Sequence, residues 1–267
     1  MTGGYAAVSL WGRDYSGARD EGLSDADLVT MLADHGLVVA ELDPAWWWTP
    51  GAGAFSIPFE LDPVDVFRFD ETELLRIAEV IGARSINAAD VLGGDWSVEE
   101  GAAAYASLCD RAAEHGLLVH LEWLAWSRVP DLTTAWEIAR LADRPNGGLT
   151  VDMWHCARTS TTIDDLLAIP GERVLSIQVD DGPADAEDDL VEATLHHRLL
   201  PGAGAFDLVG YLGALVDIGA SAPVGVEVFS DALHLLGPIE AATRAAKATR
   251  AVLEKVVDRP RGQETRP

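Results

Sequence analysis

The sequence predicts a single α/β domain built as a TIM-type (β/α)8 barrel. Short apolar runs alternate with longer helical patterns along the 267 residues, with no break in composition. Such alternation is typical of a parallel sheet covered by helices. The turn after the first apolar run, "GRDYSGARDEG", lacks the G-x-G-x-x-G of a dinucleotide-binding open sheet. A barrel over residues 1–256 is therefore favoured, followed by a polar tail at 257–267.

Seven segments have the composition of buried strands, and helical patterns separate them. The predicted strands are "YAAVSLW" (5–11), "LVVAELD" (37–43), "SINAADV" (85–91), "LLVHLEW" (117–123), "LTVDMWH" (149–155), "VLSIQVD" (174–180) and "VGVEVFS" (224–230). The predicted helices cover 24–35, 70–82, 98–115, 132–142, 162–168, 206–218 and 237–256. Asp70 and Gly82 are start and stop signals for the second helix. Ser97, followed three residues later by Glu100, predicts a capping box for the third.

Charge and composition exclude several classes of partner. The formal net charge is −25, from 19 basic and 44 acidic residues. Nucleic acids and anionic membrane surfaces both attract basic proteins, so neither is expected as a partner. The two cysteines, Cys109 and Cys156, lie far apart and show no zinc-type spacing. No apolar run reaches the ~18 residues of a membrane span, and no secretory signal is visible at the N-terminus, so we predict a cytoplasmic protein.

Oxygen-bearing side chains end four of the later strands. They are Glu122 in "HLEW", Asp152 in "VDMWH", Gln178 in "IQVDD" and Glu227 in "VEVF". Parallel strands of a barrel point their C-terminal ends at one face, so these groups are expected to converge. Three carboxylates brought together repel one another, and a divalent cation would resolve that conflict. Each residue could instead simply mark the end of its strand, but four at matching positions favour a metal site. Donors of this kind suit Mg²⁺ or Mn²⁺.

These residues resemble a known family, the xylose isomerase-like TIM barrels, which include sugar isomerases and epimerases. The late strands of that family supply Glu, Asp-x-x-His, His or Gln, and Glu, matched here by Glu122, Asp152 with His155, Gln178 and Glu227. The segment "HHRLLPGAGAFDL" also resembles the family's Arg followed by Pro-Gly-x-Gly, with Arg198 as the arginine. The resemblance implies a divalent metal cofactor, with Mn²⁺ or Mg²⁺ favoured and Co²⁺ or Zn²⁺ as alternatives.

The resemblance also implies a reaction and a role for each residue. A sugar or related hydroxy-carbonyl substrate would lose a proton next to its carbonyl, giving an enediolate that the metal stabilises. Glu122 and Glu227 would be the acid–base pair as well as ligands, and Asp152 and Gln178 ligands only. His155 would hydrogen-bond a substrate oxygen, and Arg198 would bind substrate. Two alternatives stay open: a dehydratase or lyase that uses the same site for β-elimination, and a catalytically silent barrel subunit of a complex.

Further residues are candidates for substrate contact. His120 lies two residues before Glu122 on the same side of its strand, where a core histidine is an equal alternative. The loop after the second strand contains Trp46, Trp47 and Trp48, and Trp123 lies at another strand end. Trp47 and Trp123 are predicted to contact the substrate, although core packing would use tryptophan equally well.

One departure from the family concerns the number of strands. The run "GYAAVSLWG" resembles the family's second strand, so the barrel is expected to lack the first β/α unit or to be open there. Open strand edges favour association. We therefore expect a homo-oligomer, a partner subunit or an N-terminal extension to cover the edge. After Gln178, Asp180 is predicted to orient ligands and Asp181 to belong to a solvated acidic turn.

Overall fold

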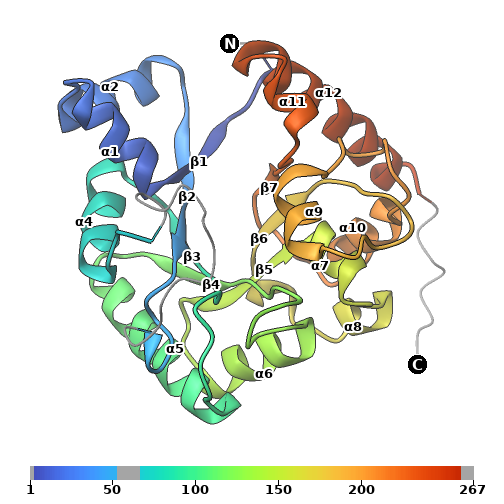
Figure 1. Ribbon diagram of the computed structural model, residues 1–267, viewed down its shortest axis with the longest axis horizontal. Coiled ribbons are helices and arrows are strands. Elements are labelled where there is room, and N and C mark those ends of the chain that lie inside the picture. The colour runs from blue at the N-terminus through green and yellow to red at the C-terminus, as the bar shows by residue number, and fades with distance from the viewer. Residues whose placement is uncertain (1–2, 53–66, 260–267) are drawn as a thin grey trace.

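Seven parallel strands form one sheet in the computed structural model, which describes residues 3–52 and 67–259. The strands are β1 (Ala7–Trp11), β2 (Val38–Ala45), β3 (Ser85–Ala88), β4 (Leu118–Leu121), β5 (Gly147–Asp152), β6 (Val174–Val179) and β7 (Val224–Val226). Each pairs in parallel with the next along the chain. In Figure 1 the sheet curls on itself, with β1 and β7 at its two ends. It is a nearly closed barrel with no described eighth strand, which confirms the predicted fold class.

Helices surround the sheet (Figure 1). They are α1 (Gly12–Asp20), α2 (Asp25–Asp34), α4 (Glu71–Ile81), α5 (Val98–Glu114), α6 (Leu132–Ala142), α7 (Met153–Arg158), α8 (Ile163–Leu167), α9 (Leu190–His196), α10 (Leu208–Asp217), α11 (Asp231–His234) and α12 (Pro238–Val257). The predicted caps are confirmed: Ser97 and Glu100 form a capping box at α5, and Asp70 accepts the N–H of Glu73 at α4. Gly82 ends α4 with φ of 64°, a left-handed conformation that favours glycine.

Three strands end three or more residues earlier than their apolar runs predicted. The segment 149–155 is a strand only as far as Asp152, and α7 begins at Met153. The side chain of Asp152 accepts the N–H of Trp154 and so caps this helix, which places His155 on the first turn of α7. The segments 85–91 and 224–230 likewise leave the sheet after Ala88 and Val226.

The core fills the space between the sheet and its helices, and one tyrosine ties two of the strands together. The buried hydroxyl of Tyr105 on α5 lies 2.8 Å from the carbonyl of Val119 and accepts the N–H of Gly148 at 3.1 Å. Gly148 allows β5 to lie close to the start of β6, because a Cβ there would overlap the backbone carbonyl of Arg173. The middle of the sheet, from which most of the predicted ligands project, is thus closely packed.

The two end strands differ from the middle of the sheet in exposure. Every residue of β3, β5 and β6 is buried, whereas no residue of β1 or β7 is. Val38 on β2 and Val224 on β7 are 63% and 41% exposed. Within the described residues, no helix has the length and apolarity to cross a membrane. Residues 260–267 of the predicted polar tail lie outside the described residues.

Candidate metal centre and active site

The four predicted ligands converge at the C-terminal ends of β4 to β7. Glu122 directly follows β4, Asp152 ends β5, Gln178 belongs to β6 and Glu227 directly follows β7. Glu122, Asp152 and Gln178 are buried, and the side chain of Glu227 is 21% exposed. This is the face on which the loops of a parallel barrel build an active site.

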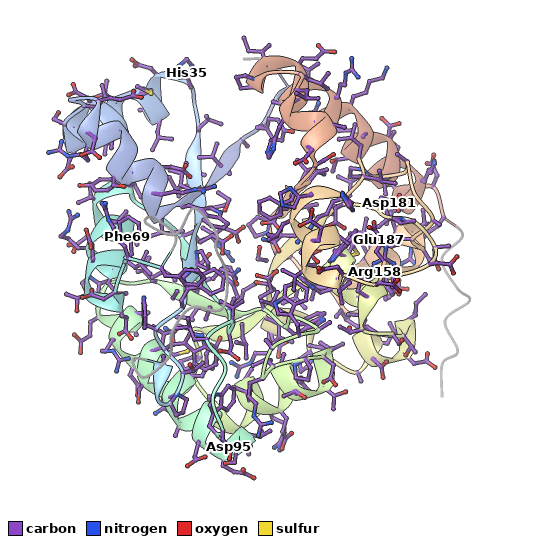
Figure 2. The ribbon with its side chains drawn as sticks, viewed as in Figure 1. His35, Phe69, Asp95, Arg158, Asp181 and Glu187 are labelled. Carbon is purple, nitrogen blue, oxygen red and sulfur yellow. The ribbon has the colours of Figure 1, made fainter. Side chains whose placement is uncertain are left out.

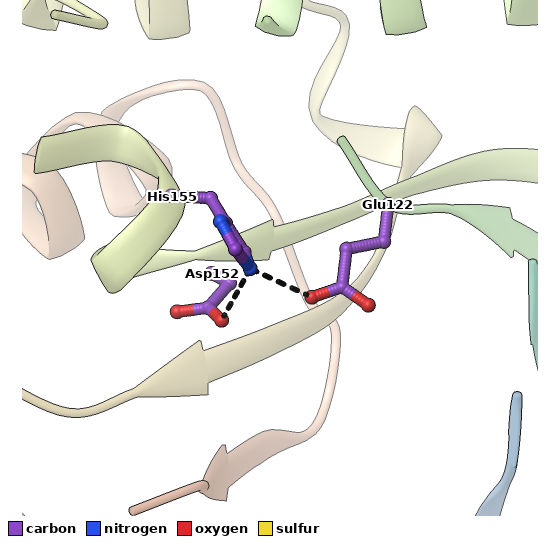
Figure 3. A group of neighbouring side chains, drawn as sticks. All are labelled: Glu122, Asp152 and His155. Carbon is purple, nitrogen blue, oxygen red and sulfur yellow. Dashed lines mark ion pairs between the residues drawn. The ribbon is translucent and has the colours of Figure 1, made fainter. Parts of the chain in front are cut away.

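Short distances connect the acidic groups. The Nε2 atom of His155 lies 3.6 Å from both Oε1 of Glu122 and Oδ2 of Asp152 (Figure 3). These three residues each offer one ligand atom within 4.8 Å of the others. The Nε2 atom of Gln178 lies 3.4 Å from Oε1 of Glu227. The structure therefore brings Glu122, Asp152, Gln178 and Glu227 to one centre, and it adds His155 as a fifth donor.

Buried polar atoms at this centre lack partners, which tests whether the residues fit a cation. Both ring nitrogens of His155 and Oε1 of Gln178 make no hydrogen bond to any described residue. A buried polar atom without a partner is costly, and a bound metal ion would supply one to a lone pair. The donors are mostly carboxylate and amide oxygens, with one imidazole within reach. This set fits a hard divalent cation and also admits zinc.

Burial shifts the pKa values of the two glutamates and the histidine of the site, and repulsion between the carboxylates adds to the shifts of the glutamates. Burial, reinforced by Glu227, Asp43 and Asp152, raises the pKa of Glu122 well above its usual range. Burial raises the pKa of Glu227 to about 7, although Arg198 opposes the shift. Burial lowers the pKa of His155 to about 4, so this imidazole is neutral at pH 7. Two carboxyl groups with raised pKa values, at the ends of different strands, are suited to exchanging protons with a substrate.

Arg198 is the counter-charge of the acidic centre. Its Nη1 atom lies 2.9 Å from Asp152 Oδ2, 2.6 Å from Asp180 Oδ2 and 3.0 Å from Glu227 Oε2. Its guanidinium also lies 5.1 Å from the centre of the Phe229 ring. Arg198 lines the pocket, as a substrate-binding residue must, but these three carboxylates already balance its charge. Asp180 holds this arginine in place, consistent with the orienting role predicted for it.

His120 belongs to a buried network beneath the site. Its ring nitrogens lie 2.6 Å from the hydroxyl of Thr150 and 2.9 Å from that of Ser85. The Nε2 atom also lies 3.4 Å from Glu41, whose carboxylate accepts a hydrogen bond from Ser176. His120 is fully buried and does not line the pocket, so this geometry supports the alternative of a core histidine over substrate contact.

A pocket of about 300 Å³ opens over the acidic centre. Glu122, His155, Arg198 and Glu227 line it, and its aromatic walls include Trp11, Trp46 and Trp126. The two tryptophans predicted to contact substrate lie elsewhere. Trp123 is fully buried in the core, and the indole N–H of Trp47 donates to the carbonyl of Phe67. Neither lines this pocket, so the geometry gives their predicted role no support.

Two functional candidates were missed by the sequence reasoning. Asn87 on β3 donates from Nδ2 to Oε2 of Glu122 at 2.6 Å and to Oδ1 of Asp43 at 2.8 Å. Asp43 on β2 lines the pocket, and burial raises its pKa well above the usual range. Asp43 ends the apolar run "LVVAELD", so the signal that found Glu122 could have found it. Asn87 carries no comparable signal, because its role depends on the register of β3 against β4.

The prediction that Asp181 belongs to a solvated acidic turn is wrong, because its side chain is buried. Its carboxylate accepts the backbone N–H groups of Gly182, Gly202 and Phe206. A Cβ at Gly204 would overlap this carboxylate, which explains the glycine at this position. Asp181 and Arg158 lie on the same side of the molecule in Figure 2. Asp181 therefore organises the loop that follows Arg198.

The chain belongs to the xylose isomerase-like TIM barrel family, and the match to this family covers residues 3–255. It is 38% identical over 125 residues to a 3-dehydroshikimate dehydratase of Pseudomonas aeruginosa, a match that covers 46% of this chain and 20% of that protein. It is 32% identical over 151 residues to an inosose isomerase of Bacillus subtilis, covering 55% and 53%. The chain thus spans about a fifth of the first relative and about half of the second.

Solved structures confirm the fold at lower identity. The IOLI protein with a bound zinc atom has a TM-score of 0.80 at 22% identity, covering 96% of this chain and 91% of that one. L-ribulose 3-epimerase has a TM-score of 0.65 at 17% identity, covering 99% and 90%. The match over residues 3–255 therefore confirms the predicted family, and Glu122, Asp152 and His155 form a group that could hold a metal ion.

Proposed function

We propose that this protein moves a proton on a carbon next to the carbonyl of a polyhydroxylated, six-membered-ring ketone, and so isomerises or epimerises it with a divalent metal ion. One observation carries the proposal. Glu122 and Glu227, at the ends of different strands, both line the pocket, and Glu122 belongs with Asp152 and His155 to the group that could hold the metal ion. One carboxylate can then remove a proton and the other carboxyl group can return one.

The metal would be held by Glu122, Asp152, Gln178 and Glu227, with His155 beside them. The oxygen donors favour Mn²⁺ or Mg²⁺, and Zn²⁺ is an alternative because the similar IOLI structure contains a zinc atom. When bound, the cation supplies a Lewis acid that makes the carbon next to the substrate carbonyl more acidic.

The residues around the centre hold the acid–base pair in place. Asn87 binds Oε2 of Glu122, which leaves Oε1 on the side of His155. Arg198 binds Oε2 of Glu227 and keeps this carboxylate beside the pocket. A neutral His155 can donate a hydrogen bond to a substrate oxygen or accept one from it. The ring of Trp126 lies 5.8 Å from the His155 ring and limits its movement.

The substrate class rests on the relatives and the pocket together. Inosose and 3-dehydroshikimate, the compounds in the relatives' names, are both six-membered carbocyclic hydroxy ketones. A pocket of about 300 Å³ has room for one such ring. The flat faces of Trp46 and Trp126 can pack against its C–H groups.

Dehydration is the second candidate, favoured by the 38% identity to the dehydratase. If the carbon β to the carbonyl carries a hydroxyl, the electrons left by proton removal can expel it as water. The same base then serves, and the second carboxylic acid protonates the leaving hydroxyl. The two reactions differ in the substrate that is bound and in whether water is lost.

Proton exchange in D₂O tests the proposal. Manganese-loaded protein is incubated with scyllo-inosose, 3-dehydroshikimate or D-fructose, and NMR measures deuterium next to the carbonyl together with product formation. We expect deuterium in a cyclic ketone, and a rate at least about 100-fold lower in Glu122→Gln and Glu227→Gln. The control is Glu137→Gln, an exposed residue paired with Arg140 on α6. Metal content is measured in every variant, so that loss of metal is distinguished from loss of acid–base function.

Three results would change the assignment. Loss of water without an isomeric product would favour the dehydratase. Exchange that survives in both glutamine variants would refute the assigned acid–base pair. Absence of bound metal together with absence of exchange would leave the silent subunit as the better description.

A further inference from the structure

Arg13 lines the pocket, and its positive charge is not paired with any acidic residue that the structure describes. It is the second residue of α1 and lines the same pocket as Glu122, Arg198 and Glu227. Its guanidinium lies 4.7 Å from the centre of the Trp11 ring and forms no ion pair with any described residue. In a chain with 44 acidic and 19 basic residues, an arginine left without an acid partner is noteworthy.

The other basic groups of the described pocket lining already lie beside carboxylates. Arg198 contacts three carboxylates. His196 lies 3.0 Å from Asp231. The Nε2 atom of His155 lies 3.6 Å from carboxylate oxygens of both Glu122 and Asp152. Arg13 is therefore the basic group of the described pocket lining that remains available to a ligand.

Two aromatic rings, Trp11 and Phe229, connect Arg13 with Arg198 at the acidic centre. From Arg13, the contacts continue through the Trp11 ring to the Phe229 ring, whose centres are 6.3 Å apart. Arg198 lies next in this series of contacts, 5.1 Å from the centre of the Phe229 ring. A ligand spanning these two rings would place its reacting carbons at the carboxylates and another part of its ring system beside Arg13.

We propose that the substrate carries a carboxylate, which Arg13 binds in the pocket beside the Trp11 ring. The inference rests on the proposed function for the ring ketone and adds the acid group to it. Arginine binds carboxylates through paired hydrogen bonds. A single arginine balances one negative charge, and the surplus of acids nearby repels a doubly charged phosphate more strongly than a carboxylate. Arg13 therefore selects ring keto acids over neutral ring ketones.

Calorimetric titration with unreactive probes tests this without turnover. The manganese-loaded protein is titrated with shikimate and with methyl shikimate, which differ in the negative charge of the carboxylate. We expect shikimate to bind about tenfold more tightly than methyl shikimate, because a hydrogen bond between charged groups stabilises a complex by about this factor. Arg13→Gln should remove the preference and Arg13→Lys should retain part of it. Arg140→Gln, an exposed arginine of α6, is the matched control and should leave it unchanged.

The outcomes separate this inference from the proposed function. Equal binding of acid and ester, a preference that survives in Arg13→Gln, or no binding of shikimate would overturn it. Tighter binding of shikimate 3-phosphate than of shikimate would also overturn it, in favour of a phosphate site. If the preference depends on Arg13 but no ketone exchanges protons, the carboxylate site stands and the proposed reaction fails. The thermal midpoint of Arg13→Gln checks folding, which should be intact because Arg13 is exposed.

Discussion

Arg198 is buried, and one of its nitrogens contacts three carboxylates. Its removal should leave these carboxylates without a counter-charge. We predict that Arg198→Gln lowers the free energy of unfolding of metal-free protein by about 3 kcal/mol or more, as expected when one partner of a buried ion pair is removed. Arg140→Gln, which breaks an exposed pair with Glu137, should cost less than about 1 kcal/mol. Urea unfolding of both variants measures the difference. Equal losses would show that the acids of the site are protonated without Arg198.

His120 makes stability dependent on pH. Burial lowers its pKa from 6.5 to about 4, so the unfolded chain binds this proton at a higher pH than the folded protein does. Unfolding therefore takes up a proton between those pH values, and acidification from pH 6.5 towards 4 favours the unfolded state, by up to about 3 kcal/mol for this residue. Above pH 6.5 both states are neutral at His120 and the effect is absent.

The comparison of wild type with His120→Gln isolates this proton. Urea unfolding is measured across the acidic range, and the wild type should lose more stability on acidification than the variant. His155 is retained in both proteins and its contribution cancels. Parallel pH profiles would show that His120 is protonated in the folded protein as readily as in the unfolded chain.

At the scale of the element, Asp152 belongs both to the start of α7 and to the candidate metal centre. Oδ1 of this residue caps the helix, while Oδ2 faces Arg198 and His155. Asn is as good an N-cap as Asp but carries no charge. We predict that Asp152→Asn keeps the cap and loses the rise in melting temperature that manganese gives the wild type. Asp152→Ala should lose both, and unfold about 1 kcal/mol more easily than Asp152→Asn.

Thermal melts with manganese or with a chelator, together with urea unfolding, separate the two roles. If Asp152→Asn is stabilised by metal as much as the wild type is, Asp152 does not hold the ion. If the asparagine and alanine variants are equally stable, the cap contributes nothing measurable.

The elements themselves could largely be predicted from the sequence, since apolar runs and capping residues are local signals. The parallel strands then required that Glu122, Asp152, Gln178 and Glu227 meet, which the structure supports. What could not be predicted depends on side chains from distant elements. His155 lies on a helix and not on a strand, because Asp152 caps that helix. His120 contacts the hydroxyls of Ser85 and Thr150, which come from other strands. The triple contact of Arg198 likewise has no sequence signal.

At the scale of the whole molecule, the end strands are partly exposed and lack a neighbour on one side within the described chain. The homo-oligomer or partner subunit expected to cover them stays a prediction. If the edge mediates self-association, Val224→Lys on β7 should shift the protein towards monomer, because charged residues on an edge discourage pairing. Val216→Lys on α10, also at an exposed valine, is the control. Sedimentation velocity at micromolar concentration reads the result, and a wild type that is monomeric throughout would refute the association.

The end position of β7 also distinguishes the two glutamates that we propose as the acid–base pair. Amide protons in β1 and β7 should exchange with solvent sooner than those in β3 to β6, because local opening starts where hydrogen-bonded neighbours are fewest. Glu227 follows β7 directly, whereas Glu122 follows the interior strand β4. We therefore expect the backbone that carries Glu227 to move more readily than the backbone that carries Glu122, and to adjust to ring substrates of different stereochemistry.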